Sequence, residues 1–91
     1  MLMYLDKQIP TIDLHGMDRE YAIFKVKEFI RDCYQLGYRQ LVIIHGRGQG
    51  ILQQAVSKYL KTDKHVLKYK LDFMNPGCTL VELRVSLDKT G

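Results

Sequence analysis

Two short segments hold most of the side chains with which this chain could do chemistry. Asp13 and His15 stand two residues apart, and His45 and Arg47 repeat that spacing later in the chain. An imidazole, with an unperturbed pKa of about 6.5, can accept or donate a proton near neutral pH, and a nearby carboxylate can orient the ring or raise its pKa. A guanidinium can hold a phosphate through two parallel hydrogen bonds. Together these residue types indicate acid–base chemistry at a phosphate group.

The segments around these residues predict a strand, a helix and a second strand. Residues 11–15 form a short strand bounded by proline and glycine, and residues 40–44 form a continuous apolar run. Between them, a helix from about Asp18 to residue 36 carries an apolar stripe, and Gly37 is placed to end it. The strands of such a unit are parallel and end at the same edge of the sheet. We therefore expect both histidine segments to emerge from the core and to share one rim.

Alternation along the first strand predicts which side chains are neighbours. Ile12 and Leu14 share one face, and Asp13 and His15 share the other. The carboxylate should therefore lie beside the imidazole. The apolar run of residues 40–44 is typical of a strand that is covered on both faces.

The rest of the chain predicts a second helix, ending near Lys61, and two more strands. These strands alternate over residues 67–73 and 81–85, and the loop at residues 74–78 has the composition of a hairpin. The apolar residues of the two strands are expected to face one way: Leu67, Tyr69, Leu71, Phe73, Val81, Leu83 and Val85. The predicted fold class is α/β, a two-layer α/β sandwich in the order βαβαββ with two helices and a mixed four-stranded sheet.

Length and composition limit the organisation of the chain. Its 91 residues, 46% of them hydrophobic, fit one small domain over residues 11–87, between an N-terminal arm (1–10) and a C-terminal tail (88–91). No apolar run reaches the about 18 residues of a membrane span, and residues 1–5 are too short for a signal peptide. We expect a cytoplasmic protein without membrane association, in which Cys33 and Cys78 are reduced structural thiols.

Basic residues are concentrated in the middle of the chain. Residues 39–70 hold seven lysines and arginines against Asp63 alone, a net +6, whereas the rest of the chain carries −2 of the overall +4. This asymmetry favours a phosphate-rich partner such as nucleic acid, with Lys68 and Lys70 among the contacts. The alternative is that several of these lysines belong to the solvated faces of a helix and a strand.

A glycine-rich segment leads from the second predicted strand into the second helix. Its glycines let the backbone approach a ligand at a place where free N–H groups and the helix dipole favour an anion. The spacing departs from the dinucleotide fingerprint, so no nucleotide cofactor is expected. We predict that the residues of this segment bind substrate: Gly46, Arg47, Gly48, Gln49 and Gly50.

Three other rings are assigned to packing. His65 lies near the start of a strand among lysines, Tyr38 precedes the apolar run, and Phe73 belongs to an apolar strand face. For Tyr38 and Phe73, stacking on a nucleobase is the alternative.

The two histidine segments resemble the motifs of a known family. Ile12-Asp13-Leu14-His15-Gly16 and His45-Gly46-Arg47-Gly48 are similar to the L-D-L-H-G and H-G-x-G motifs of the Smr (small MutS-related) domain, in the same order. The resemblance covers roughly residues 11–85. It departs from the family in Ile12, which replaces leucine, and in a shorter glycine-rich loop, reduced to residues 75–79.

The resemblance implies a compact βαβαββ fold similar to the C-terminal domain of bacterial translation initiation factor three. It also implies nucleic-acid binding, with endonuclease activity in several members. The first motif maps onto Asp13 and His15, and the second onto His45, Gly46 and Gly48. Because members occur within mismatch-repair-like or ribosome-associated proteins, a ribosome or a repair protein is an implied partner.

The residue types favour some phosphodiester chemistries over others. RNA carries its own nucleophile, the 2′-hydroxyl, so one imidazole could take its proton while another protonates the leaving oxygen. Hydrolysis of DNA commonly uses divalent metals held by several carboxylates. Near the motifs, Asp13 is the only carboxylate. We expect an endonuclease with Asp13, His15 and His45 as catalytic residues, cleaving RNA or nicking DNA without a required cofactor. A divalent metal bound by the same three residues is the alternative.

Two functions without chemistry stay open. In the first, the domain is a nucleic-acid-binding module whose histidines donate hydrogen bonds or pack. In the second, it docks on a ribosome or a repair factor through the N-terminal arm. Product formation distinguishes an endonuclease from a binding module. Weak affinity for naked nucleic acid would indicate a docking domain.

Overall fold

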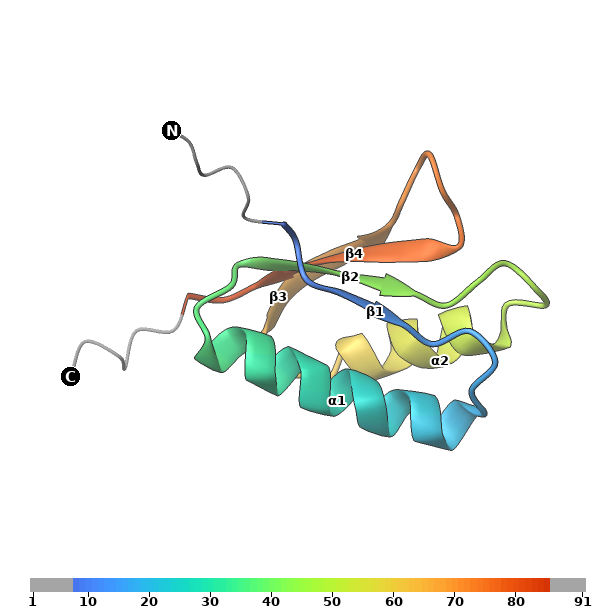
Figure 1. Cartoon of the computed structure of the whole chain (residues 1–91), viewed down its shortest axis with the longest axis horizontal. Coiled ribbons are helices and arrows are strands. Elements are labelled where there is room, and N and C mark those ends of the chain that lie inside the picture. Colours follow the sequence, from blue (N-terminus) through green and yellow to red (C-terminus); the bar gives the residue numbers. More distant parts are fainter. Residues whose placement is uncertain (1–7, 86–91) are drawn as a thin grey trace.

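A computed structural model describes residues 8–85 of the chain. Residues 1–7 of the predicted N-terminal arm and the predicted tail (88–91) lie outside the described residues. The elements follow the predicted order (Figure 1): β1 (Thr11–Asp13), α1 (Arg19–Gln35), β2 (Gln40–Ile44), α2 (Ile51–Leu60), β3 (Val66–Leu71) and β4 (Cys78–Leu83).

The four strands form one mixed sheet in the order β1-β2-β4-β3. The β1–β2 pair is parallel, whereas β4 is antiparallel to both β2 and β3. Both helices lie against the same face of this sheet (Figure 1), so the molecule has two layers and the predicted fold class is confirmed. Within residues 8–85, no helix covers the other face, which we call the open face. For this reason the prediction that residues 40–44 are covered on both faces is wrong: Leu41 and Ile43 are buried, but Val42 and Ile44 are only half-buried.

The core fills the space between the helices and the sheet. The predicted stripe of α1 is confirmed, because Ala22, Val26, Ile30 and Cys33 are all buried. Gly37 ends this helix with a positive φ of 88°, a conformation that suits a residue without a Cβ atom. The helix begins after Asp18, whose side chain makes no capping hydrogen bond. Within residues 8–85, no helix is long and apolar enough to cross a membrane.

Both cysteines are free and buried, as predicted for structural thiols. Burial raises the pKa of the Cys33 thiol to about 11, and the carboxylate of Asp32 contributes in the same direction.

The prediction fails most clearly along β3. This strand begins at Val66, and a β-bulge between Val66 and Lys68 interrupts the alternation, so that Leu67 is exposed. The strand ends at Leu71, which leaves Phe73 in the following loop with 92% of its surface exposed. Core packing of Phe73 was therefore a wrong prediction.

Two further predictions of apolar packing are corrected. Tyr38, in the short connection before β2, is 39% exposed and does not belong to the core cluster. The last strand begins at Cys78 and ends at Leu83, so Val85 lies beyond it and is exposed.

Three connections meet at one end of the sheet. The loops from β1 to α1, from β2 to α2 and from β3 to β4 all lie at this end (Figure 1). The first two contain the histidine motifs. The third, residues 72–77, has hairpin geometry as predicted, although it begins two residues earlier than expected.

Candidate functional site

The first motif forms a turn at the end of β1. Asp13 is the last residue of the strand and pairs with Ile44 of β2, and the buried Leu14 donates its backbone N–H to the carbonyl of Ile44 (2.8 Å). The Asp13 carboxylate accepts a hydrogen bond from the backbone N–H of His15 (2.9 Å). Both Asp13 and His15 are exposed. The carboxylate therefore stabilises the turn, and among residues 8–85 the imidazole of His15 has no hydrogen-bond partner.

The second histidine occupies a different environment. His45 is only 5% exposed, so the prediction that it emerges at the rim is wrong. Side chains alternate along β2, and His45 continues the core-facing series of Leu41 and Ile43. Its Nε2 lies 2.8 Å from Oγ1 of Thr79, a residue that is itself 1% exposed, and its Nδ1 lies 3.0 Å from the carbonyl oxygen of Gly46.

These two contacts determine the proton positions on the His45 ring. A carbonyl oxygen can only accept, so Nδ1 carries the proton that is donated to Gly46. In the neutral ring, Nε2 then accepts a hydrogen bond from the Thr79 hydroxyl. Both nitrogens are occupied, and the ring links the end of β2 to the beginning of β4. Sequence reasoning missed Thr79, since the contact depends on the register of strands that are far apart along the chain.

The loop after His45 is held against the β3–β4 connection. The carbonyl of Gly77 accepts hydrogen bonds from the backbone N–H groups of His45 (2.9 Å) and Gly46 (3.0 Å). A Cβ atom at Gly77 would lie 3.4 Å from Cγ of Arg47, so these two loops are in close contact. Gly46 has a φ of 83°, which allows the chain to turn sharply at this point.

The predicted substrate-binding residues of this loop lie at the surface. Arg47, Gly48 and Gln49 are exposed, and Gly50 precedes α2 with a φ of 82°. Arg47 makes no ion pair within residues 8–85. In the same range, none of the backbone N–H groups of residues 47–50 donates a hydrogen bond, so they are available to an anion.

A second carboxylate lies at the same end of the sheet. Strand pairing places Asp13, Ile44 and Cys78 in one row, and the backbone N–H of Asp72 donates to the carbonyl of Cys78 (2.9 Å). Burial raises the pKa of the Cys78 thiol, and the negative charges of Asp72 and then Asp13 raise it further. Asp72 is thus hydrogen-bonded to Cys78 across the hairpin, and Asp13 lies two strands away in the same row. The sequence signal for Asp72 was its alternation with Lys68 and Lys70, which predicted all three side chains on one face of the sheet.

The two predicted lysines lie on the open face of the sheet, not at the rim itself. Lys68 and Lys70 are opposite Glu82 and Leu80 of β4, respectively. The Lys68 ammonium is 4.0 Å from a carboxylate oxygen of Glu82, an exposed pair. Lys70 makes no ion pair among the described residues and is the nearer of the two, along β3, to the motif-bearing end.

The described residues contain no group of three histidine, cysteine, aspartate or glutamate side chains that could hold a metal ion. Asp13, His15 and His45 are therefore not arranged as three ligands of one ion. His65, assigned to packing, lies far along the chain from the motifs, with its ring 4.1 Å from that of Tyr34 and its Nδ1 3.5 Å from Asp63.

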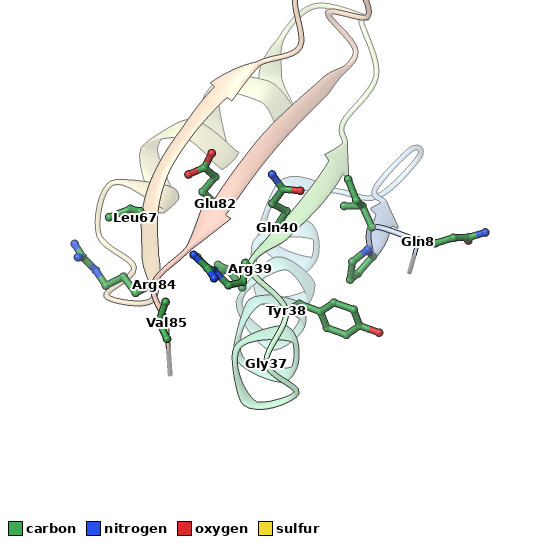
Figure 2. A pocket seen from close by; sticks show the side chains of 12 residues that line it. Gln8, Gly37, Tyr38, Arg39, Gln40, Leu67, Glu82, Arg84 and Val85 are labelled. Carbon is green, nitrogen blue, oxygen red and sulfur yellow. The ribbon is translucent and has the colours of Figure 1, made fainter. Parts of the chain in front are cut away.

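A groove lies at the opposite end of the strands from the two motifs. This groove of about 840 Å³ is lined by residues at the beginning of β2 and the end of β4, including Arg39, Glu82 and Arg84 (Figure 2). None of the residues of the two motifs contributes to it. The groove and the motif-bearing rim are separate features.

The fold and the rim define a small α/β domain with two histidine motifs at the carboxyl ends of adjacent parallel strands. The family model of the Smr domain matches residues 12–84. The chain belongs to the Smr domain family, and the resemblance of its motifs is thereby confirmed.

Two relatives named endonuclease MutS2 are much longer than this chain. It is 38% identical over 77 residues to endonuclease MutS2 of Caldanaerobacter subterraneus subsp. tengcongensis, an alignment that covers 81% of the chain and 10% of the relative. It is 35% identical over 85 residues to endonuclease MutS2 of Clostridium botulinum (strain Eklund 17B), covering 90% of the chain and 11% of the relative. The chain thus spans about a tenth of the length of these relatives.

Solved structures share the fold. The Smr domain of Thermus thermophilus MutS2 superposes with a TM-score of 0.82 at 30% identity, covering 84% of this chain and 99% of that one. YdaL, a stand-alone small MutS-related protein from Escherichia coli, superposes with a TM-score of 0.79 at 24% identity, covering 88% and 70%.

Proposed function

We propose that this Smr domain binds nucleic acid at the motif-bearing rim and cleaves phosphodiester bonds there. The observation that carries the proposal is the presence, at one sheet edge, of an exposed imidazole (His15), an exposed guanidinium (Arg47) and free backbone N–H groups, none of which has a hydrogen-bond or ion-pair partner within residues 8–85. The relatives named endonuclease MutS2 support the activity. The positive charge of Lys70 on the adjoining open face supports nucleic acid as the partner.

The chemistry that these residues serve best is cleavage of RNA. His15 would take the proton of a 2′-hydroxyl as its oxygen attacks the adjacent phosphorus. The bond from phosphorus to the 5′-oxygen then breaks, leaving a 2′,3′-cyclic phosphate and a 5′-hydroxyl that takes its proton from water. Arg47 and the free N–H groups of the loop would hold the phosphate oxygens, where negative charge develops.

In this proposal Asp13 and His45 act differently from His15. Asp13 holds the turn that carries His15, through the hydrogen bond from the backbone N–H. His45, with both nitrogens engaged, is a positioning residue: it fixes the Gly46 carbonyl and the start of β4, and so holds the loop that carries Arg47. Nicking of DNA is the second candidate substrate. It requires an activated water, and the test therefore includes divalent metal.

A cleavage assay tests the proposal. Labelled single-stranded RNA, double-stranded RNA and supercoiled plasmid are incubated with the protein in EDTA, in Mg²⁺ or in Mn²⁺, and the RNA ends are identified by mass spectrometry. We expect RNA products with cyclic phosphates in EDTA, lost in His15→Ala and in Arg47→Ala. Cleavage only in the presence of Mg²⁺ or Mn²⁺ would indicate that a metal-activated water, and not the 2′-hydroxyl, attacks the phosphorus.

The assay also separates an endonuclease from a binding module. Equal product from the wild type and His15→Ala would show that the activity is contamination or does not use this rim. Binding without product on any substrate would leave a nucleic-acid-binding module. No binding at all would favour docking on a ribosome or a repair protein.

A further inference from the structure

The most exposed large hydrophobic side chains of the described residues lie beside the rim. Phe73 is 92% exposed and Met74 is 82% exposed, and both belong to the loop between β3 and β4. Exposure of an aromatic ring to water is unfavourable, and neither residue belongs to the core cluster or packs against it. The fold gives no reason for a phenylalanine at this position.

The loop that carries Phe73 is built to hold its shape. Asp72 accepts a hydrogen bond from the backbone N–H of Met74 (3.0 Å), and Asn75 accepts one from that of Gly77 (3.1 Å). Backbone bonds from Asp72 to Cys78 (2.9 Å) and from Cys78 to Asn75 (3.0 Å) close the hairpin. Hydrogen bonds therefore hold the loop in one shape before and after Phe73 in the sequence. A loop that is already ordered loses less conformational entropy when a ligand binds.

The same loop is fastened to the candidate phosphate site. Gly77 accepts from the N–H groups of His45 and Gly46, and it is in close contact with Arg47. Just before this loop, β3 presents Lys70 on the open face of the sheet. A strand whose phosphate is held by Arg47 would thus pass along the loop that carries the exposed Phe73, with a second cation, Lys70, farther along the hairpin.

From this arrangement we propose that Phe73 stacks on an unpaired base of the bound strand, so that the rim selects single-stranded nucleic acid over duplex. The inference rests on the proposed function and adds its substrate class. Stacking requires a base whose face is free, because a paired base inside a helix is already covered by its neighbours. Met74, the next residue, is a second exposed apolar side chain of this loop.

The test is binding of labelled oligonucleotides of about 12 nucleotides, within the range that a small single-strand-binding domain covers, as single strands and as duplexes at one fixed salt concentration. Phe73→Ala should weaken single-strand binding about 5- to 150-fold and leave duplex binding unchanged. Phe24→Ala is the matched control, because Phe24 is also exposed (53%) but lies on α1 in the other layer. It should bind as the wild type does.

The sequence contains no tryptophan, so a single introduced tryptophan reports on binding through its own fluorescence. In Phe73→Trp the indole should keep the affinity, and its fluorescence should be quenched by a single strand; in Phe24→Trp it should not. Unchanged single-strand binding by Phe73→Ala would overturn the inference while leaving the proposed function standing. Equal losses for single strand and duplex would also overturn it, in favour of a wedge inserted into duplex. Failure of the wild type to bind either form would overturn both proposals.

Discussion

Two turns of this molecule follow adjacent parallel strands, and each contains a histidine at or just beyond the strand end, before a glycine with positive φ. At the β1 turn, His15 is exposed and its ring has no hydrogen-bond partner within residues 8–85. At the β2 turn, His45 is buried and both ring nitrogens are engaged, by Gly46 and Thr79. The two residues have the same sequence signature, but only one can exchange a proton with a ligand in this arrangement.

The comparison teaches that the environment of an imidazole, and not its motif, determines what it can do. Two imidazoles would complete the acid–base pair of RNA cleavage, and the sequence offered two. In the structure the ring of His15 is open to a ligand, whereas the buried ring of His45 connects β2 to β4. Substitutions at the two turns should therefore separate a chemical role of His15 from a positioning role of His45.

The largest expected effect is on the cleavage rate. His15→Ala should lower it about 100-fold or more, the range for loss of a general acid or base, with little change in stability. Because the site is exposed, added imidazole should restore part of the activity of His15→Ala. Imidazole should not rescue His45→Ala, whose cavity is buried. Rescue of His45→Ala but not of His15→Ala would reverse the two roles.

The second effect is on stability. His45→Ala should lower the free energy of unfolding by about 2–4 kcal/mol, because it leaves a cavity and removes the partner of the buried Thr79 hydroxyl. His15→Ala, at an exposed position, should change it by less than about 0.5 kcal/mol. Urea unfolding followed by circular dichroism measures both. Similar values for the two variants would contradict the difference in burial that underlies the comparison.

Substitution of Thr79 examines the His45 ring from the other side. Thr79→Val keeps the shape but removes the hydroxyl that bonds Nε2, and should cost about 1–3 kcal/mol by leaving a buried nitrogen unsatisfied. Thr79→Ser keeps the hydroxyl and should retain the hydrogen bond to His45. The chemical shifts of the His45 ring nitrogens should move in the valine variant and stay close to wild type in the serine variant. If valine leaves them unmoved, the contact does not hold the ring.

The smallest effect concerns the glycines of the second turn. Gly46→Ala should cost about 1–2 kcal/mol, because a residue with a Cβ atom is strained at a φ of 83° even where space is open. Gly48→Ala is the matched control: Gly48 has no positive φ and open space around it, so its cost should stay within about 0.5 kcal/mol. Thermal unfolding distinguishes them, and equal costs would show that the loop relaxes around Gly46.

Much of the fold could be predicted because its signals are local. The apolar stripe of α1, the glycine that ends it and the order of elements depend on residues a few positions apart, and they were confirmed. The prediction failed at β3, where a bulge between Val66 and Lys68 leaves Leu67 exposed and the strand ends at Leu71, before Phe73. A bulge arises from pairing with another strand, so the sequence of β3 alone does not reveal it.

The sequence by itself determined the family, the fold class and the set of residues that are capable of acid–base chemistry or phosphate binding. These depend on residue type, spacing and periodicity. Only the tertiary structure decided which of them are available. The burial of His45 against Thr79 depends on the register of distant strands. So does the contact of Arg47 with Gly77, which belongs to the same loop as the exposed Phe73. Long-range pairing places a side chain toward the core or toward solvent, and that placement assigns its role.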